Sequence, residues 1–274
     1  MKKKVFIIGS GFSSLSAACY LAKYGFDVSV FEKNDSFGGR ARQFKVNGYT
    51  FDMGPSWYWM PDVFERFFEG FGKKVSDYYK LERLDPGYQV VFGKDDVFPV
   101  FDGIEKIADR FEMEEKGSGQ KLISFLNQAK RNYDVAIDDL VYKPGVSPLE
   151  LVTPVTIKNV GLFLTNVRKQ VERDFKSPKL RSLLQFPVLF LGAKPEQTPA
   201  FYNFMNYADF GLGTWHPKGG MIQIVNAMVS LAKELGVRFH TDAPVSEILT
   251  KNKTANGIRI GDTIHESDII VSGA

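Results

Sequence analysis

The pattern of apolar and polar positions opens with a short strand, a helix and a second strand. Residues 5–8 form a continuous apolar run, which is typical of a strand buried on both faces of a parallel sheet. From Phe12 to Tyr24 apolar residues recur at helical spacing, and Gly25 follows as a C-cap. Residues 27–32 predict a second strand. Strands joined in this way through a helix form a right-handed, parallel βαβ unit, so the chain begins as an α/β fold.

The middle of the chain is mostly helical in pattern, and short strands return near its end. Charged, helical patterns cover residues 104–141 and 151–175 and indicate an inserted helical region. A further helical stretch begins near Pro178 and ends in an apolar segment before Gly192. After a helix expected at 222–235, runs separated by turn residues predict strands at 237–240, 245–250, 257–260, 263–266 and 268–271.

Composition and charge narrow the class of protein. The 274 residues are 44% hydrophobic and 24% charged, which favours a folded, soluble chain over a disordered or polytopic membrane protein. With 35 basic against 32 acidic residues and no long block of like charge, we expect no nucleic-acid partner. One cysteine excludes an intrachain disulfide framework, and three scattered histidines predict no metal site.

The first residues copy a signal peptide only superficially. Lys2 to Lys4 precede an apolar run, but Gly9 and Gly11 interrupt that run after a few residues. The sequence contains no uncharged apolar span of about 18 residues. We therefore expect neither export nor a transmembrane helix, and a cytoplasmic location.

The residues between the first strand and its helix have the composition of a nucleotide-binding turn. Gly9 permits a tight turn, and Gly11 lets the backbone approach a pyrophosphate. Phe12 and Ser13 begin the helix, whose N-terminus supplies oriented N–H groups and a positive dipole. Ser14 stands where Gly or Ala is usual, a departure that the fold can absorb. The position between strand and helix favours a dinucleotide site over a glycine turn without a ligand.

An acidic residue and a basic segment follow the second strand. Glu32 lies about 20 residues after Gly11, where an acidic side chain accepts hydrogen bonds from a ribose diol. Its charge repels a 2′-phosphate, so the site suits FAD or NAD over NADP. The segment FGGRAR places Gly39, Arg40 and Arg42 where guanidinium groups neutralise a diphosphate, with a solvated basic turn as the alternative. These residues alone leave the choice of dinucleotide open.

Further motifs stand later in the chain. They are FDMGPS at 51–56, WYWMP at 57–61, GAKP at 192–195 and WHPKGGM at 215–221. Together with the GSGFSSL turn, Glu32 and GGRAR, they resemble the FAD-dependent phytoene desaturase family of carotenoid biosynthesis over essentially the whole chain. The wider flavoprotein superfamily, including amine and protoporphyrinogen oxidases, shares the first motifs, so only the later ones are specific to carotenoid enzymes.

The resemblance implies an FAD site. Its implied cofactor-binding residues are Gly9, Gly11, Phe12, Ser13, Ser14, Glu32, Lys33, Gly39, Arg40, Arg42, Met53, Gly54, Pro55, Ser56 and Val245. Among them, Gly11, Ser13 and Ser14 would meet the pyrophosphate, and Glu32 would meet the adenosine ribose.

The other implied contacts reach the remaining parts of the cofactor. Arg40 and Arg42 would meet the phosphates and the flavin side, and Gly54 with Pro55 the flavin edge. Val245 would give backbone contacts to the adenine. One departure from the family pattern is His216, which stands where an aromatic such as tyrosine is expected, so no role is assigned to it.

The resemblance also implies the fold class and the domains. The fold is α/β, with a Rossmann-like FAD-binding domain, in which a parallel sheet is joined by a β-meander, and an inserted, largely helical region. We expect residues 1–75 and 220–274 to form the discontinuous FAD-binding domain, and 76–219 the substrate-binding and membrane-docking region. Members of the family continue beyond the last strand here, so we expect an N-terminal fragment with weak FAD binding and little activity of its own.

The implied reaction introduces double bonds into phytoene or a related carotenoid, with the flavin as hydride acceptor. The sequence shows no Ser/His/Asp or paired-carboxylate pattern, so the catalytic residue is left unassigned. Candidates for the wall of an apolar substrate tunnel are Trp57, Trp59, Phe64, Phe67 and Phe68. A place in the protein core explains these aromatic residues equally well.

A substrate this apolar dissolves in a bilayer, so we expect a monotopic, peripheral attachment to the membrane surface. Residues 179–191 are the best candidate, since they join Lys179 and Arg181 to several leucine and phenylalanine residues. Pro187 interrupts the helix, and the segment is too short to span. An interior helix is the alternative interpretation.

Two rival functions stay open at this point. One is another flavin oxidoreductase of the same superfamily, either a later carotenoid desaturase or oxygenase or an amine oxidase. The other is a non-enzymatic, lipid-binding escort protein of the same fold without flavin. The joint presence of Gly11, Glu32 and Arg40 argues against the escort. The sequence does not indicate the oligomeric state.

Overall fold

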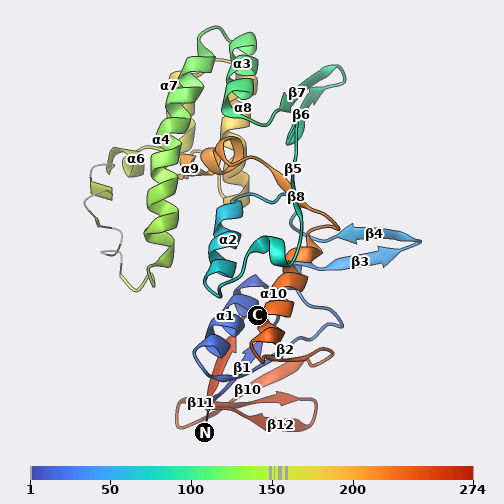
Figure 1. Ribbon diagram of the computed structural model, residues 1–274. Coiled ribbons are helices and arrows are strands. Elements are labelled where there is room, and N and C mark those ends of the chain that lie inside the picture. Colours follow the sequence, from blue (N-terminus) through green and yellow to red (C-terminus); the bar gives the residue numbers. More distant parts are fainter. Residues whose placement is uncertain (1, 148–149, 151, 154–155, 158–159, 274) are drawn as a thin grey trace. The chain divides into compact units, whose positions relative to one another are not determined.

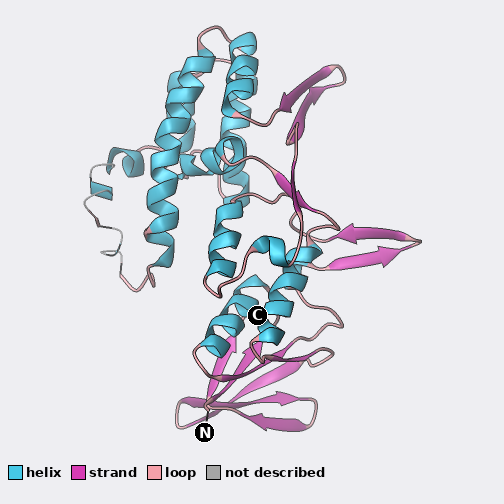
Figure 2. Ribbon diagram, viewed as in Figure 1, coloured by secondary structure: helices cyan, strands magenta, loops and turns pink. Residues whose placement is uncertain are grey.

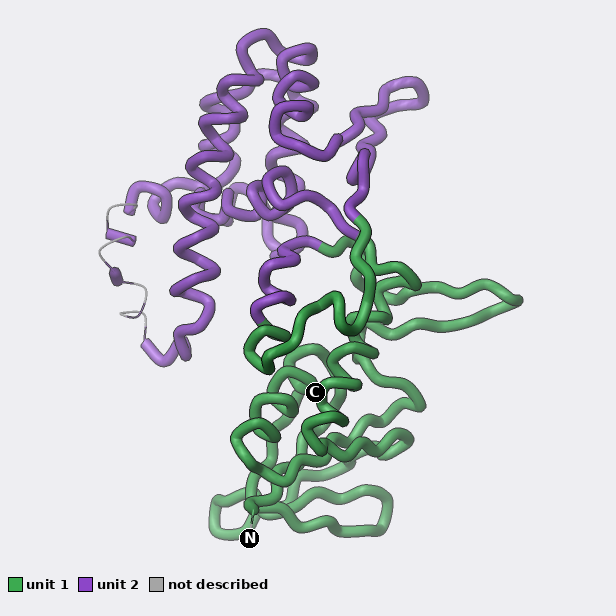
Figure 3. Tube along the Cα trace, viewed as in Figure 1, with its two compact units in different colours: residues 1–58, 67–82, 216–274 green, residues 59–66, 83–215 purple. Residues whose placement is uncertain are grey.

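The computed structural model describes residues 2–273 except 148–149, 151, 154–155 and 158–159 (Figure 1). The chain divides into two units (Figure 3): unit 1 comprises residues 1–58, 67–82 and 216–274, and unit 2 comprises residues 59–66 and 83–215. The domain boundaries expected at 75/76 and 219/220 stay a prediction. Relative to them, unit 1 gains 76–82 and 216–219, and unit 2 gains 59–66.

A four-stranded parallel sheet forms the centre of unit 1. Its strands are β1 (Lys4–Ile8), β2 (Asp27–Phe31), β9 (Arg238–His240) and β13 (Ile269–Ser272), in the order β13-β1-β2-β9. Val5 of β1 lies in register with Val28 of β2 and with Ile269 of β13. The predicted βαβ unit is present, and the last predicted strand returns beside the first.

Two helices of unit 1 pack against each other, α1 (Phe12–Lys23) and α10 (Ile222–Glu234). Leu15, Ala18 and Cys19 of α1 are fully buried. The Cys19 thiol lies 3.8 Å from the carbonyl oxygen of Met228 in α10. Burial raises the pKa of Cys19 to about 12, so the thiol stays protonated and packs as a small apolar side chain.

An antiparallel meander packs against the same sheet. It consists of β10 (Val245–Lys251), β11 (Thr254–Ile260) and β12 (Thr263–Glu266). Ile258 of β11 is fully buried in one apolar cluster with Phe6 and Phe31. Side chains alternate along a strand, so Val5 and Ile7, the neighbours of Phe6, point to the opposite face. The sheet therefore has one face on the meander, and Figure 2 shows α1 and α10 on its other side.

The remaining strands form two-stranded sheets. In unit 1, β3 (Gln43–Val46) pairs with β4 (Tyr49–Asp52). In unit 2, β6 (Tyr88–Gly93) pairs with β7 (Asp96–Val100). Where the chain passes between the units, β5 (Leu81–Arg83) pairs with β8 (Trp215–Pro217), and a unit boundary also falls inside α2 (Pro61–Glu69).

Unit 2 is largely helical, as expected. Among the described residues, its other α-helices are α3 (Ile104–Glu114), α4 (Ser118–Asp138), α6 (Val160–Leu164), α7 (Val167–Asp174), α8 (Pro178–Gln185) and α9 (Phe204–Asn206). Part of the helical pattern expected at 151–175 lies outside the described residues. One core cluster of unit 2 joins apolar residues from β7, α3, α4, α7 and α8, among them Phe98, Phe111 and Leu122, together with Phe175.

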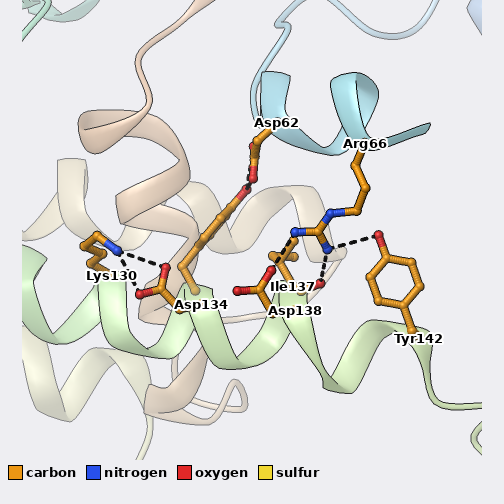
Figure 4. A network of polar contacts seen from close by, with 8 residues as sticks. Asp62, Arg66, Lys130, Asp134, Ile137, Asp138 and Tyr142 are labelled. Carbon is orange, nitrogen blue, oxygen red and sulfur yellow. Dashed lines mark hydrogen bonds and ion pairs between the residues drawn. The ribbon is translucent and has the colours of Figure 1, made fainter. Parts of the chain in front are cut away.

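Polar contacts within unit 2 hold the first half of α2 against α4 (Figure 4). Arg66 contacts the Asp138 carboxylate at 2.5 Å and donates to the carbonyl oxygen of Ile137 at 3.0 Å. The Tyr133 hydroxyl donates to the Asp62 carboxylate at 2.9 Å. The Arg66–Asp138 pair is partly exposed, so by itself it contributes about 1 kcal/mol or less. These contacts explain why residues 59–66 belong to unit 2.

A carboxyl group is buried in unit 2 at a π-helical turn, residues 207–211. The Tyr88 hydroxyl donates to Asp209 Oδ2 at 2.5 Å, whereas Asp209 Oδ1 has no hydrogen-bond partner among the described residues. Burial raises the pKa of Asp209 to about 8, against the opposing effect of the Tyr88 hydroxyl. The carboxyl is therefore neutral at pH 7, the form that suits an apolar surrounding.

We expect this buried carboxyl to make stability depend on pH. From pH ~4 to ~8 the unfolded chain has released a proton that the folded chain still binds, so the free energy of unfolding falls as pH rises through this window. Asp209→Asn imitates the neutral form. Its free energy of unfolding, measured with urea, should exceed that of the wild type by roughly 5 kcal/mol above pH 8 and approach it near pH 4.

The matched control is Asp95→Asn, which alters an exposed carboxylate of the same unit. Equal pH slopes for wild type and Asp209→Asn would contradict the assignment.

Candidate functional site

Unit 1 contains a cavity of about 970 Å³ at the carboxyl ends of β1 and β2, the usual ligand position in open parallel sheets. Residues from the glycine turn, the end of β2, the basic segment, the FDMGPS motif and the start of β10 line it. They are Ile8, Gly9, Ser10, Gly11, Phe12, Ser13, Phe31, Glu32, Lys33, Asn34, Gly38, Gly39, Arg40, Ala41, Arg42, Gly54, Pro55, Ala243, Pro244, Val245 and Gly273.

The glycine turn presents bare backbone to this cavity. Gly9 has a φ of 88°, the left-handed region that favours glycine, and its N–H donates to the Phe31 carbonyl at 2.8 Å. Gly11 caps α1 with an extended backbone, φ −69° and ψ 171°, which any residue adopts. A Cβ built on Gly11 meets no protein atom within 4 Å. The fold itself therefore does not require glycine at position 11.

This open space fits a phosphate group at the N-terminus of α1. The first turn of a helix directs N–H groups outward, and its dipole favours negative charge. α1 begins at Phe12, directly after the bare Gly11 backbone. The lack of a side chain at position 11 thus suits close approach by a pyrophosphate.

Glu32 occupies the end of β2, with a side chain that is 3% exposed. Its Oε2 accepts hydrogen bonds from the Ser10 backbone at 3.0 Å and the Ser10 hydroxyl at 2.6 Å. Its Oε1 accepts from the Asn34 backbone at 3.0 Å and the Asn34 side-chain amide at 2.5 Å. Burial alone would raise the pKa of Glu32, but these hydrogen bonds outweigh it and lower the pKa. The group is a fixed anion at neutral pH, suited to ribose hydroxyls and not to a 2′-phosphate.

The basic segment lies against the glycine turn. The Gly38 N–H donates to the Ser10 carbonyl at 3.0 Å, and Gly39 has a φ of 58°. A Cβ built on Gly39 would lie 3.3 Å from Gly11 Cα, so the two backbones are nearly in contact. This approach brings Arg40 to the cavity wall, next to the helix N-terminus.

The FDMGPS motif is held to the basic segment by its backbone. The Met53 N–H donates to the Arg42 carbonyl at 2.7 Å. Gly54 has a φ of 82°, and a Cβ there would lie 2.4 Å from the Arg40 carbonyl oxygen. Only glycine tolerates this contact, which places Gly54 and Pro55 at the cavity.

Most of the predicted cofactor-binding residues line this one cavity. They are Gly9, Gly11, Phe12, Ser13, Glu32, Lys33, Gly39, Arg40, Arg42, Gly54, Pro55 and Val245. The three that do not are Ser14, Met53 and Ser56. A Cβ built on Gly273 would lie 1.9 Å from Ser14 Oγ, so the buried Ser14 packs against the backbone after β13. This is the packing role of the third position of such turns.

Sequence reasoning missed several residues of the cavity wall. Ser10 and Asn34 hold Glu32, and Gly38, Ala41, Ala243, Pro244 and Gly273 also line the cavity. Ser10 lies within the glycine turn, and Asn34 lies two residues after Glu32. Their closeness in sequence to predicted site residues could have identified both as part of the cavity wall. Nothing in the sequence points to Gly273, which β-sheet pairing brings next to β1.

The five aromatic candidates for a substrate tunnel are not gathered in one place within either unit. Phe67 and Phe68 lie in unit 1, and Phe68 is fully buried with its ring 5.0 Å from that of Tyr78. Trp57 also lies in unit 1, whereas Trp59 and Phe64 lie in unit 2. For Phe68, burial favours the core interpretation; the substrate roles of the others stay predictions.

The segment 179–191, expected to dock on a membrane, is mostly interior. Lys179 contacts Asp96 at 2.6 Å, and Arg181 donates to the Phe175 carbonyl at 2.7 Å. The leucines of α8 are buried. α8 ends at Gln185 because Pro187 lacks an N–H, and a 3₁₀ helix follows over 186–191.

The large apolar side chains of this segment that are open to solvent lie at its end. Leu189 is 67% exposed and Phe190 is 51% exposed. In the described part of the chain, none of the helices is both long and apolar enough to cross a bilayer.

The sequence of this chain is similar to those of known flavin enzymes. Residues 12–272 match the family model described as flavin containing amine oxidoreductase. A carotenoid 3,4-desaturase of Haloarcula japonica is 42% identical over 98% of this chain, and a zeta-carotene-forming phytoene desaturase of Myxococcus xanthus is 34% identical over 99% of it. The chain spans about half of these relatives, 55% and 53% of their lengths.

A solved structure, an oxidoreductase from Methanosarcina mazei, shares the fold. It matches with a TM-score of 0.63 and 21% identity, over 98% of this chain and 58% of that one. These matches confirm the expected α/β fold class and the resemblance to carotenoid desaturases. The description of the family as flavin-containing, together with the fit of the cavity to a dinucleotide, confirms FAD as the expected cofactor.

Glu32→Leu should weaken FAD binding, because it removes the acceptor for the ribose hydroxyls. A hydrogen bond to a charged group contributes roughly 1.5 to 3 kcal/mol, so we expect the Kd to rise about 10-fold to 150-fold. Titration of the full-length protein, followed by flavin fluorescence, measures this. Circular dichroism checks that the variant folds. An unchanged Kd would overturn the role of Glu32.

Gly11→Ala separates a ligand effect from a folding effect. The methyl group meets no protein atom, so the free energy of unfolding without cofactor should stay within about 0.5 kcal/mol of the wild type. FAD affinity should fall about tenfold or more, because the methyl group occupies the space for the pyrophosphate. Gly161→Ala, which also meets open space but lies outside the cavity, is the control. Equal FAD affinities in both variants would contradict the pyrophosphate assignment.

Proposed function

Because this chain belongs to the family of flavin-containing amine oxidoreductases, we propose that the full-length protein is an FAD-dependent carotenoid desaturase. Its substrate is phytoene or a related carotenoid. The observation that carries the proposal is the 42% identity to a carotenoid 3,4-desaturase over nearly the whole chain. The cavity of unit 1 supports it, since the residues for a dinucleotide lie together there.

The residues of the chain have distinct tasks in this proposal. Glu32, held by Ser10 and Asn34, binds the ribose hydroxyls. The Gly11 backbone and the N-terminus of α1 bind the pyrophosphate, and Arg40 neutralises its charge. When bound, FAD supplies the redox chemistry by accepting a hydride from the substrate. The chain's remaining task is to hold an apolar substrate away from water.

The name of the matched family makes amine oxidation the second candidate function. The two candidates differ in substrate, because an amine is small and polar and a carotenoid is long and apolar. The lipid-binding escort is disfavoured by an intact dinucleotide site: a protein without FAD has no need for a bare Gly11 beside Gly39 and a fixed Glu32 anion.

The first experiment compares the 274-residue chain with its full-length parent. We expect the parent to show flavin absorption and to convert phytoene or another carotenoid in liposomes, with new absorption bands from the longer conjugated system. The shorter chain should show weak flavin absorption. Turnover of amines without carotenoid turnover would instead support an amine oxidase. A parent that stays colourless with excess FAD would support the escort.

We also propose a peripheral attachment to the membrane from the cytoplasm. The support is the solubility of a carotenoid in the bilayer and the exposed apolar end of the 186–191 helix. Burial of α8 narrows the docking element from the whole segment 179–191 to Leu189, Phe190 and Leu191. Each fully buried side chain of this kind contributes about 1.5 to 3 kcal/mol.

Flotation with liposomes containing anionic lipid tests this attachment. The full-length protein should float with the lipid, and Leu189→Glu should lower the recovered fraction several-fold. Met113→Glu is the matched control, because Met113 is an exposed apolar residue of the same unit, 77% exposed against 67% for Leu189. Full recovery of the wild type in the soluble fraction would refute the proposal.

A further inference from the structure

A second cavity of unit 1 lies on the meander side of the parallel sheet. Its volume of about 380 Å³ is in the range of small-molecule sites. Alternate residues of three neighbouring strands form its floor: Lys4 and Phe6 of β1, Ser29 and Phe31 of β2, and Arg238 and His240 of β9. Thr241, Ala243, Ile260 and His265 complete the wall.

Strand register explains why these side chains meet. Phe6 pairs with Ser29, and Ser29 pairs with Arg238, so the three lie side by side across the sheet. Two residues further along both strands, Phe31 pairs with His240. Residues two apart on a strand share a face, so all of these side chains point toward the meander.

This face departs from the ordinary pattern of a parallel sheet. Such sheets are buried on both faces and are apolar throughout. Here the meander covers the apolar part, where Ile258 packs on Phe6 and Phe31. Toward the edge strand β9, the face instead carries Arg238 and His240, and both are exposed.

The lining of this cavity is cationic. Lys4 and Arg238 carry its positive charge, His240 and His265 add imidazole groups, and none of its lining residues, all of them described, is acidic. The rings of His240 and His265 lie 4.7 and 6.0 Å from the ring of Phe31, so both imidazoles flank this one aromatic ring.

Two acidic residues contact this lining from outside: Asp27 contacts Arg238, and the Asp268 carboxylate accepts a hydrogen bond from the Lys4 backbone N–H at 2.7 Å. Arg238 contacts Asp27 at 2.7 Å and donates to the Ser29 hydroxyl at 3.3 Å, which fixes its guanidinium group. Asp27 thereby offsets one positive charge. Lys4 adds a second positive charge at the other end of the floor.

We propose that this cavity binds a small phosphate ester whose phosphate lies between Lys4 and Arg238 and whose remaining part packs on Phe6, Phe31 and Ile260. Guanidinium, ammonium, imidazole and hydroxyl donors are the groups that bind phosphate oxygens. The site is distinct from the FAD cavity, although Phe31 and Ala243 contribute to both walls. The proposal does not depend on the desaturase activity.

Calorimetric titration of the full-length protein, with excess FAD present throughout, tests the site. The probes are adenosine monophosphate, inorganic phosphate and adenosine. Excess FAD keeps the first cavity closed to these probes. We expect saturable binding of the monophosphate, competition by inorganic phosphate, and no binding of adenosine.

Two variants and a control assign the binding to this cavity. Lys4→Gln and Arg238→Gln should each weaken binding of the monophosphate about tenfold, with unchanged flavin absorption. Lys251→Gln removes an exposed cation of the same unit outside the cavity and should leave binding unchanged. Saturable binding of phosphate alone, lost in the same two variants, would identify free phosphate as the ligand. No saturable binding at millimolar concentrations, or equal loss in all three variants, would overturn the proposal.

Discussion

The carboxylate of Glu32 is the constraint on which the cofactor cavity depends. Its side chain accepts four hydrogen bonds from Ser10 and Asn34, which ties the turn after β1 to the loop after β2. Its backbone N–H donates to the His240 carbonyl at 2.8 Å, and its carbonyl accepts from the Ala243 N–H at 2.9 Å. A buried anion costs several kcal/mol unless it is fully hydrogen-bonded, so these segments are held in one arrangement.

Gly11, Gly39 and Gly54 let the segments around Glu32 approach closely enough to form one wall of the cofactor cavity. A Cβ on Gly39 would lie 3.3 Å from Gly11 Cα, so the basic segment could not carry a large side chain at this contact, and Gly54 closes on the Arg40 carbonyl in the same way. Motifs separated by tens of residues thus form one wall. A group with phosphates can approach that wall because backbone, rather than side chain, faces it.

A further link joins the last motif to this wall. Asp52, at the end of β4, accepts a hydrogen bond from the Met221 N–H at 2.8 Å at the start of α10. A Cβ built on Gly220 would lie 2.6 Å from the Asp52 carboxylate. The FDMGPS and WHPKGGM motifs are therefore coupled through the N-terminus of one helix. This contact explains Gly220 of the second motif by local packing, without a direct contact of that glycine with a ligand.

Local patterns in the sequence determined the βαβ unit, the returning strands and most residues of the cofactor-cavity wall. Apolar periodicity, glycine turns and the position of Glu32 can be recognised because they depend only on residues close in sequence. Tertiary structure decided what depends on distant partners. Ser14 is a packing residue because β13 brings Gly273 beside it. Lys179 pairs with Asp96 and Arg181 donates to the Phe175 carbonyl, while the leucines of α8 are buried. The cationic cavity likewise required β1, β2 and β9 in register, a juxtaposition of residues 4, 29 and 238 that no local pattern contains.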